Sequence, residues 1–412
     1  MRLFLLIFLT LVLSCSNKKT IPSSMKNFDS VPGTFAYDLA FLNQFQNTVV
    51  LSDSNGQAKL IIIPGWQARV MTSSANGDSG FSYGWINYKL IESRKPAEHM
   101  NAFGGEERLW LGPEGGPFSV YFASGKTQDF ANWYVPAVID TESFDQLSVE
   151  NTKAAFSKKF SLTNYSGTKL DVLIERTIEL LDKKTIESTL GFALPEGIMS
   201  MAYQSDNVMT NQGSAEWNKK TGMLSIWMLS MFNPSPAITI FIPYRDVNDA
   251  KEIPIINDDY FGKISPERLI VKDGTIWFKA DGKFRSKLGV PPQRATGWAG
   301  SYDAQNGVLT LLWCDIPEDN PVYVNSKWGA QTKPFSGDAL NAYNDGPVED
   351  GSQMGPFYEL ESSSPAANLK PGENIVHQQR IYHFEGDEEE LGIITRNLLG
   401  IDIQVIKSQF KL

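Results

Sequence analysis

The sequence predicts an all-β protein of the β-sandwich class with a few short helices. Short runs rich in Val, Ile and aromatic residues recur along most of the chain. They are separated by Asn-Gly, Pro-Gly and similar turn pairs, which is the usual pattern of successive strands. The 33 glycines and 22 prolines among 412 residues suit many tight turns. Helical spacing is confined to two segments, so layered sheets are expected to form the body of the protein.

The first residues predict export. Met1-Arg2 is a short positive start, and the run from Leu3 to Leu13 is apolar apart from Thr10. This order is typical of a secretory signal, and the run is shorter than the about 20 residues that span a bilayer. The run ends on Ser-Cys, which resembles a bacterial lipobox. We therefore expect residues 1–15 to be a lipoprotein signal peptide with Cys15 lipidated; the alternative is an ordinary signal peptide that contains a cysteine.

Residues 16–30 are polar and are expected to form a flexible tether, followed by one folded domain over residues 31–412. The expected location is a bacterial membrane, facing the periplasm or the cell surface, with the lipid as the only membrane contact. A net charge of −10 argues against nucleic acid or an anionic membrane surface as a partner. The chain also lacks phosphate-cradling, dinucleotide-binding and serine-hydrolase motifs, so no cofactor is expected.

The elements follow in order from local patterns. A helix is predicted over 35–45, with Thr34 as its N-cap, and another over 387–399, opened by acidic residues. The segment 171–181 could be a helix by composition, but its β-branched residues favour a long strand. Strands are predicted over 49–51, 59–63, 67–72, 118–122, 155–162, 170–181, 185–192, 199–203, 223–229, 238–242, 275–278, 308–314, 357–361 and 374–384.

The segment Gly104–Gly116 predicts the wall of a polar cleft. It combines three carboxylates (Glu106, Glu107 and Glu114) with Arg108 and Trp110 between two glycine pairs. Buried charges are costly unless they are paired, and a solvated loop has no need of Trp and Leu at alternating positions. A guanidinium can bind oxygens with a planar fork, and an indole offers a flat apolar face. This combination favours recognition of a sugar.

A second acidic cluster lies near the C-terminus, in Tyr-Glu-Leu-Glu. If this segment is a strand, Glu359 and Glu361 face the same side. Two carboxylates on one face repel each other, which raises one pKa and can create a general acid or base. Exposure of both carboxylates from an edge strand is an equally acceptable interpretation.

Histidines and thiols offer few other candidates. His99 adjoins the glycine-rich segment and titrates near neutrality, although a solvent-exposed position is the simpler interpretation. His377 and His383 share one face of a predicted strand, which suits sheet packing or an exposed position. Cys314 lies in an apolar run and is expected to be a buried structural thiol. The acidic loop 341–351 has oxygen ligands suitable for calcium but no EF-hand spacing, so a solvated loop is preferred and no metal is predicted.

Together the two clusters resemble the aldose 1-epimerase (galactose mutarotase)-like proteins. The resemblance is carried by Leu360-Glu361, by the downstream Leu-x-Pro-Gly-Glu, and by Arg69 followed by the Gly-Gly segment. More closely, the chain resembles an uncharacterised family of secreted lipoproteins thought to share that fold. The resemblance implies a β-supersandwich with a sugar on a concave face and Glu361 as the catalytic base. In that family a central histidine is the catalytic acid. Residues 199–243, where this histidine should lie, contain none, so the resemblance supplies no acid.

We therefore expect a lipid-anchored carbohydrate-binding protein, with proton transfer at the anomeric or a neighbouring carbon as its chemistry. Glu361 is the expected base, and His99 or Glu107 is the candidate acid. The other residues expected to contact the sugar are Arg69, Arg108, Trp110, Glu106, Glu114 and Glu359. A non-catalytic glycan-binding lipoprotein of a surface polysaccharide-utilisation system is the main alternative. A lyase or hydrolase is disfavoured, because Glu359 and Glu361 would lie on one side of the sugar.

Overall fold

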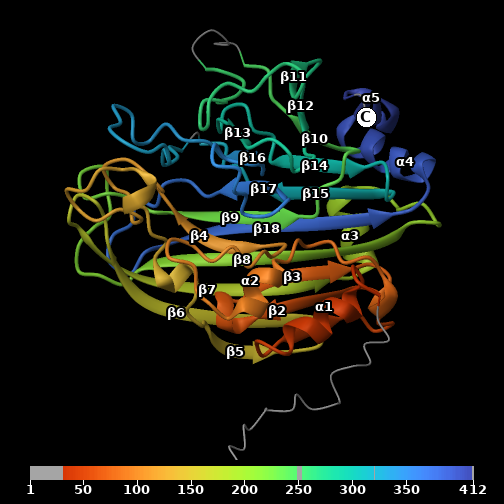
Figure 1. The fold of residues 1–412 in the computed structure, drawn as a ribbon, viewed down its shortest axis with the longest axis horizontal. Helices are drawn as coiled ribbons and strands as arrows, with labels where there is room; N and C mark the ends of the chain where they lie inside the picture. Colours follow the sequence, from red (N-terminus) through yellow and green to blue (C-terminus); the bar gives the residue numbers. More distant parts are fainter. Residues whose placement is uncertain (1–30, 248–252, 320, 411–412) are drawn as a thin grey trace, which may run out of the picture.

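The computed structural model describes residues 31–247, 253–319 and 321–410, and its strands form two facing layers (Figure 1). The predicted all-β class with a few short helices is confirmed. The predicted signal peptide, the lipidated Cys15 and the tether lie outside the described residues. Within the described part of the chain, no helix is long and apolar enough to cross a membrane.

The larger layer is a ten-stranded sheet in which the paired strands run antiparallel. Its long central strands carry alternating buried and exposed residues, which is the pattern of a sheet with one covered face. In Figure 1 it extends from β5 at one edge to β11 at the other. From edge to edge the strands are β11 (Leu269–Lys272), β12 (Thr275–Lys279), β10 (Ile238–Pro243), β14 (Trp298–Asp303), β15 (Val308–Cys314), β18 (Asn374–Glu385), β8 (Met199–Asn211), β7 (Lys169–Leu181), β6 (Lys153–Thr163) and β5 (Asp145–Val149).

The second layer consists of a five-stranded and a three-stranded sheet. A pair of backbone hydrogen bonds between Val70 and Glu107 joins the two sheets. The five-stranded sheet positions the candidate site. Its order is β13 (Ser286–Val290), β16 (Leu340–Asn344), β17 (Tyr358–Ser363), β9 (Ser225–Phe232) and β4 (Arg108–Gly112); the smaller sheet contains β1 (Val49–Ser52), β2 (Lys59–Ile63) and β3 (Arg69–Ser74).

The main core lies between the two layers. Side chains such as Leu360 from β17 and Ile381 from β18 belong to one continuous buried cluster. Cys314 is part of it and is 1% exposed, which confirms the predicted buried thiol. Apolar side chains fill the space between the inner faces of the two layers. Polar residues on the strands must therefore form hydrogen bonds with each other in the core or point outward.

The helices cover the three-stranded sheet and part of the outer face of the ten-stranded sheet. Two helices, α1 (Phe35–Leu42) and α2 (Tyr88–Ser93), pack against the three-stranded sheet. The other three pack on the outer face of the ten-stranded sheet: α3 (Lys183–Leu190), α4 (Glu388–Leu399) and α5 (Ile403–Ser408). Both predicted helices are confirmed, although α1 ends earlier than expected. The predicted strand over 185–192 is wrong: this segment is the helix α3, capped by Asp182 and ended by Gly191 in a left-handed conformation. The expected strand over 118–122 is also absent.

Candidate functional site

Strand β17 supplies the centre of the candidate site. Tyr358 and Ser362 point into the core, where their hydroxyls lie 2.8 Å from Ser301 Oγ and 2.7 Å from His377 Nε2. Because side chains alternate along a strand, Glu359 and Glu361 point to the opposite, outer face of the five-stranded sheet. The prediction that the two carboxylates share one face is confirmed.

Glu361 is fully buried and has three polar contacts. Lys287 Nζ lies 2.9 Å and 2.8 Å from its two carboxylate oxygens, and Trp227 Nε1 donates to it at 2.9 Å. The Lys287 ammonium lies between two aromatic rings, 4.8 Å from the Trp227 ring centre and 5.5 Å from that of Tyr260. Since cations are attracted to ring faces, these rings fix the ammonium beside the carboxylate. Glu361 is thus held by a cation and an indole, in position to accept hydrogen bonds or a proton.

Glu359 forms the second charged pair of this face. Arg108 donates to its carboxylate at 3.1 Å, and both side chains are almost fully buried. The Arg108 guanidinium also lies 4.2 Å from the ring centre of Trp110. Burial raises the pKa of Glu359 to about 7, and neighbouring Glu361 acts in the same direction, whereas Arg108 opposes the shift. Glu359 therefore titrates near neutral pH, which suits a group that exchanges protons.

Loops carry further polar groups over this face. Burial raises the pKa of Glu114, although Lys287 and a hydrogen bond from Trp328 oppose the shift, and Glu361 adds to it. Asp338 accepts from Asn257 at 2.6 Å and from Tyr260 at 2.5 Å. We call Glu114, Lys287, Glu359, Glu361 and Arg108 the carboxylate site. It combines three carboxylates, two cations and several aromatic rings.

The structure separates Glu106 and Glu107 from this site. Ser73 Oγ donates to Glu106 at 2.7 Å, and His383 Nε2 of β18 lies 2.8 Å from it. Glu107 pairs with Arg176 of β7 and accepts from Gln379 of β18 at 2.7 Å. Both carboxylates are 0% exposed and lie between the two layers. This position corrects our expectation that Glu106 and Glu107 line one cleft with Glu361.

These interior contacts belong to a polar layer that joins the two sheets. Burial raises the pKa of Glu107 and lowers that of Arg176, while their mutual attraction opposes both shifts. Burial also lowers the pKa of His377 to about 4. His377 and His383 therefore pack between the sheets, as their shared strand face predicted. We call Glu106, Glu107, Arg176, His377, Gln379 and His383 the interior polar layer.

Arg69 and His99 do not contact Glu361 in the described part of the chain. Arg69 is fully buried, donates to the carbonyl oxygen of Gly104 at 2.9 Å and lies 5.8 Å from the Phe103 ring centre. Burial and the charge of Arg108 lower its pKa to about 9. The His99 Nδ1 lies 2.7 Å from the carbonyl oxygen of Trp133. The two candidates thus lie beside the site, outside its charged centre.

Sequence reasoning missed Lys287, Trp227, Tyr260 and Trp328. Lys287 lies in the short segment Ser-Lys-Leu-Gly-Val, which carries no recognisable motif. Only the pairing of β13 with β16 and of β16 with β17 brings it near Glu361. A search for a cation near a predicted carboxylate pair could not have selected one lysine among the others.

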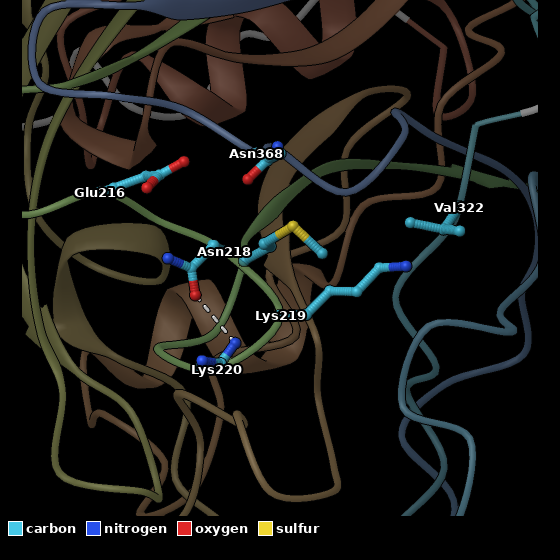
Figure 2. A pocket seen from close by; sticks show the side chains of 7 residues that line it. Glu216, Asn218, Lys219, Lys220, Val322 and Asn368 are labelled. Carbon is cyan, nitrogen blue, oxygen red and sulfur yellow. Dashed lines mark hydrogen bonds between the residues drawn. The ribbon is translucent and has the colours of Figure 1, made fainter.

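A separate hollow of about 450 Å³ lies among loops at another position (Figure 2). None of its lining residues belongs to the carboxylate site. In Figure 2 the side chain of Lys219 extends toward Val322, and Asn218 accepts from the backbone of Lys220. The lining residues are Glu216, Asn218, Lys219, Lys220, Met223, Val322 and Asn368.

Metal ligands do not gather in the described residues: no group of three or more His, Cys, Asp or Glu side chains could hold an ion. In the acidic loop, Asp345 instead accepts from Tyr343 at 2.9 Å and from the backbone of Gly355 at 3.1 Å. The oxygens considered for calcium are therefore partly used in local hydrogen bonds.

Several solved structures, two of which are described as galactose mutarotase-like or mutarotase-related proteins, are similar to this chain in fold. The Slr1438 protein of Synechocystis sp. PCC 6803 is 12% identical, with a TM-score of 0.49 over 83% of this chain and 96% of that one. A galactose mutarotase-like protein of Lactobacillus casei ATCC 334 is 12% identical, with a TM-score of 0.44 over 82% and 99% of the two chains. A galactose mutarotase related enzyme of Lactobacillus acidophilus is 9% identical, with a TM-score of 0.44 over 83% and 97%.

These values concern overall architecture and carry no argument about activity. The chain itself belongs to DUF6786, a family of unknown function whose model matches residues 33–410. No curated protein matches the chain. Function must therefore be argued from the site.

Proposed function

We propose that this protein binds a carbohydrate on the outer face of the five-stranded sheet, at the carboxylate site. The observation that carries the proposal is the environment of Glu361, whose oxygens are held by Lys287 and Trp227. Carboxylates and cations can hydrogen-bond ring hydroxyls, and nearby indole faces can pack against the apolar side of a pyranose. Trp227 and Trp110 lie opposite each other on β9 and β4, so this face supplies both kinds of contact.

A second candidate function is sugar isomerisation by proton transfer. It is favoured by carboxylates with divergent environments: the pKa of Glu359 is raised to about 7 and that of Glu114 is also raised, whereas Glu361 is paired with a cation. Groups of this kind can act as acid and base at one site. Glu361 would accept the hydroxyl proton, and Glu114 is the better acid than His99 because it lies in the field of Glu361 and Lys287. As the anomeric hydroxyl loses its proton and becomes the C1=O carbonyl, the C1–O5 bond would break, and the ring oxygen O5 would take that bond's electron pair and the proton from Glu114.

The test of binding uses Glu361→Gln, which preserves shape but removes the charge that holds Lys287. Affinities for D-galactose, D-glucose, D-mannose and L-rhamnose would be measured by calorimetry or ligand-observed NMR. We expect a loss of about tenfold or more, since hydrogen bonds to a buried charge contribute about 1.5–3 kcal/mol. Glu175→Gln, at an exposed position of β7, is the matched control. Equal affinity of Glu361→Gln and wild type for every sugar bound would refute the site.

The catalytic candidate is tested separately by NMR of anomer interconversion. Glu361→Gln and Glu114→Gln should each abolish the protein-dependent rate while circular dichroism remains unchanged. If wild type binds a sugar but does not accelerate interconversion for that sugar, the protein is a binding module and the isomerase candidate is wrong.

We also propose that the protein is exported and anchored through lipid on Cys15, where it would serve a surface glycan system. The support is the order of charged, apolar and Ser-Cys segments at the start of the sequence. Cells expressing wild type or Cys15→Ala would be labelled with an alkyne-modified fatty acid. Label on wild type alone, with Cys15→Ala released from membranes, is expected. Equal labelling of both forms, or of neither, would contradict the anchor.

A further inference from the structure

Three large aromatic side chains are exposed on the loops near the carboxylate site. Phe130 is 62% exposed, Tyr134 is 45% exposed and Trp328 is 38% exposed. We call them the aromatic rim. Exposed apolar patches of this kind usually mark a binding surface, because a solvated aromatic ring contributes nothing to the core.

Trp133 connects two members of the rim. Its ring stacks on Phe130 at a centroid distance of 6.1 Å and on Trp328 at 5.9 Å, with interplanar angles of 25° and 29°. The His99 ring packs against two members of the rim, with ring centroids 4.5 Å from Phe130 and 4.7 Å from Tyr134. The rim is therefore a supported platform, in which the buried Trp133 and the half-buried His99 pack against the exposed rings.

The platform is continuous with the carboxylate site. Trp133 also lies 6.4 Å from Trp110, the ring that packs against Arg108. On the other side, Trp328 hydrogen-bonds Glu114. A ligand bound at the carboxylate site could therefore extend onto the aromatic rim, beyond the rings that pack around Glu361.

The same cluster carries hydrogen-bond donors without acceptors. Trp110 Nε1 and Trp133 Nε1 are buried and have no partner among the described residues. The indole nitrogen can only donate, so each suits an oxygen-rich ligand better than an apolar one. Ring faces combined with such donors fit a pyranose, which has an apolar face and hydroxyl groups at its edge.

We infer that the ligand is a neutral oligosaccharide, with one sugar at the carboxylate site and further sugars stacked on the aromatic rim; this inference rests on the proposed function. We infer more than one sugar because the aromatic rings continue from the carboxylate site onto the rim. The neutrality follows from the nearby cations: Arg108, Lys287 and Lys327 pair with Glu359, Glu361 and Asp259 respectively. A polyanionic glycan would have to displace these carboxylates.

Binding would be measured for homologous neutral oligosaccharides of one to six sugars, in several linkages, with a uronate oligomer for comparison. Affinity for the neutral series should rise with length. Phe130→Ala and Tyr134→Ala should each weaken the longer ligands between about twofold and about tenfold, the range expected for one aromatic contact, and leave the monosaccharide unchanged. Phe284→Ala, which removes another exposed ring 49% exposed to solvent, is the matched control.

The outcomes separate this inference from the proposed function. If a monosaccharide binds but affinity does not rise with length, or if Phe130→Ala and Tyr134→Ala bind long ligands as wild type does, the oligosaccharide inference fails alone. Tighter binding of the uronate oligomer would also overturn it. If no saccharide of any length binds, both fail.

Discussion

Glu106 and Glu107 lie in the interior polar layer, whereas Glu359 and Glu361 lie on the outer face of the same five-stranded sheet. Both pairs are almost fully buried, and each pair includes an ion pair with an arginine or lysine. The two pairs differ in which sheet supplies the side chains that contact them. The interior pair is held by side chains of the ten-stranded sheet. The outer pair is held by side chains of its own sheet, from β4, β9 and β13. Burial of the carboxylates therefore does not separate the two pairs, but the position of their partners does.

The largest expected effect is on the interior pair. Glu107→Ala leaves the fully buried Arg176 without its carboxylate, which should cost about 3–5 kcal/mol of the free energy of unfolding. Chemical denaturation would measure it. The double variant Glu107→Leu/Arg176→Met should recover much of the loss, because no lone charge remains. A loss below about 1 kcal/mol for Glu107→Ala would show that this pair does not stabilise the fold.

His377 should make stability depend on acid pH. Its pKa in the folded protein is about 4, below the ordinary value of 6.5, because burial disfavours the charged ring. Since the unfolded chain binds the proton first, stability is complete above about pH 6.5 and falls as pH decreases toward 4, by about 3 kcal/mol from this group. The slope should disappear in His377→Gln. Identical pH profiles of unfolding free energy for the two proteins would contradict this assignment.

Glu359 should act with the opposite sign. Its folded-state pKa of about 7 lies above the ordinary 4.5, so its stabilising contribution is complete below about pH 4.5 and is lost as pH rises through 7. The expected difference is about 3 kcal/mol, since the folded-state pKa of about 7 already includes the attraction of Arg108. Glu359→Gln should flatten this part of the profile. A variant that loses stability more steeply with rising pH than wild type would exclude the raised pKa.

The smallest effect is expected at an exposed pair. Lys153 and Glu179 lie 2.8 Å apart on β6 and β7, but their side chains are 46% and 42% exposed. Lys153→Ala should change stability by less than about 1 kcal/mol, and added salt should remove the difference. This variant is the baseline for the three buried cases. A change as large as that of Glu107→Ala would mean that burial is not the controlling variable.

Local patterns are sufficient to predict most long strands and the helices α1 and α4. Alternation and β-branched residues predict β7 and β18, and a run of acidic residues predicts the start of α4. The error at α3 has a local cause: Thr and Ile suggested a strand, while Asp182 as N-cap and Gly191 as C-cap carried the better signal. Short strands such as β16 escaped notice because Leu-Asn-Ala-Tyr-Asn is half polar.

The directions of the side chains just before β4 could not be predicted from the sequence. Consecutive residues in a regular strand point to opposite sides, so Glu106 and Glu107 should have separated. Instead Gly104 and Gly105 have φ values of +95° and +119°, which turn the chain before β4 and direct both carboxylates inward. A side chain at Gly105 would also meet Arg69, since a Cβ there would lie 2.6 Å from Arg69 Cδ.

By itself the sequence determined the all-β class, most of the long strands and the common face of Glu359 and Glu361, because these depend on periodicities of a few residues. The tertiary structure alone decided that Lys287 and Trp227 hold Glu361, that Glu107 faces Arg176, and that an aromatic rim adjoins the site. Strand register and layer packing bring together residues far apart in the chain. No local pattern encodes that pairing.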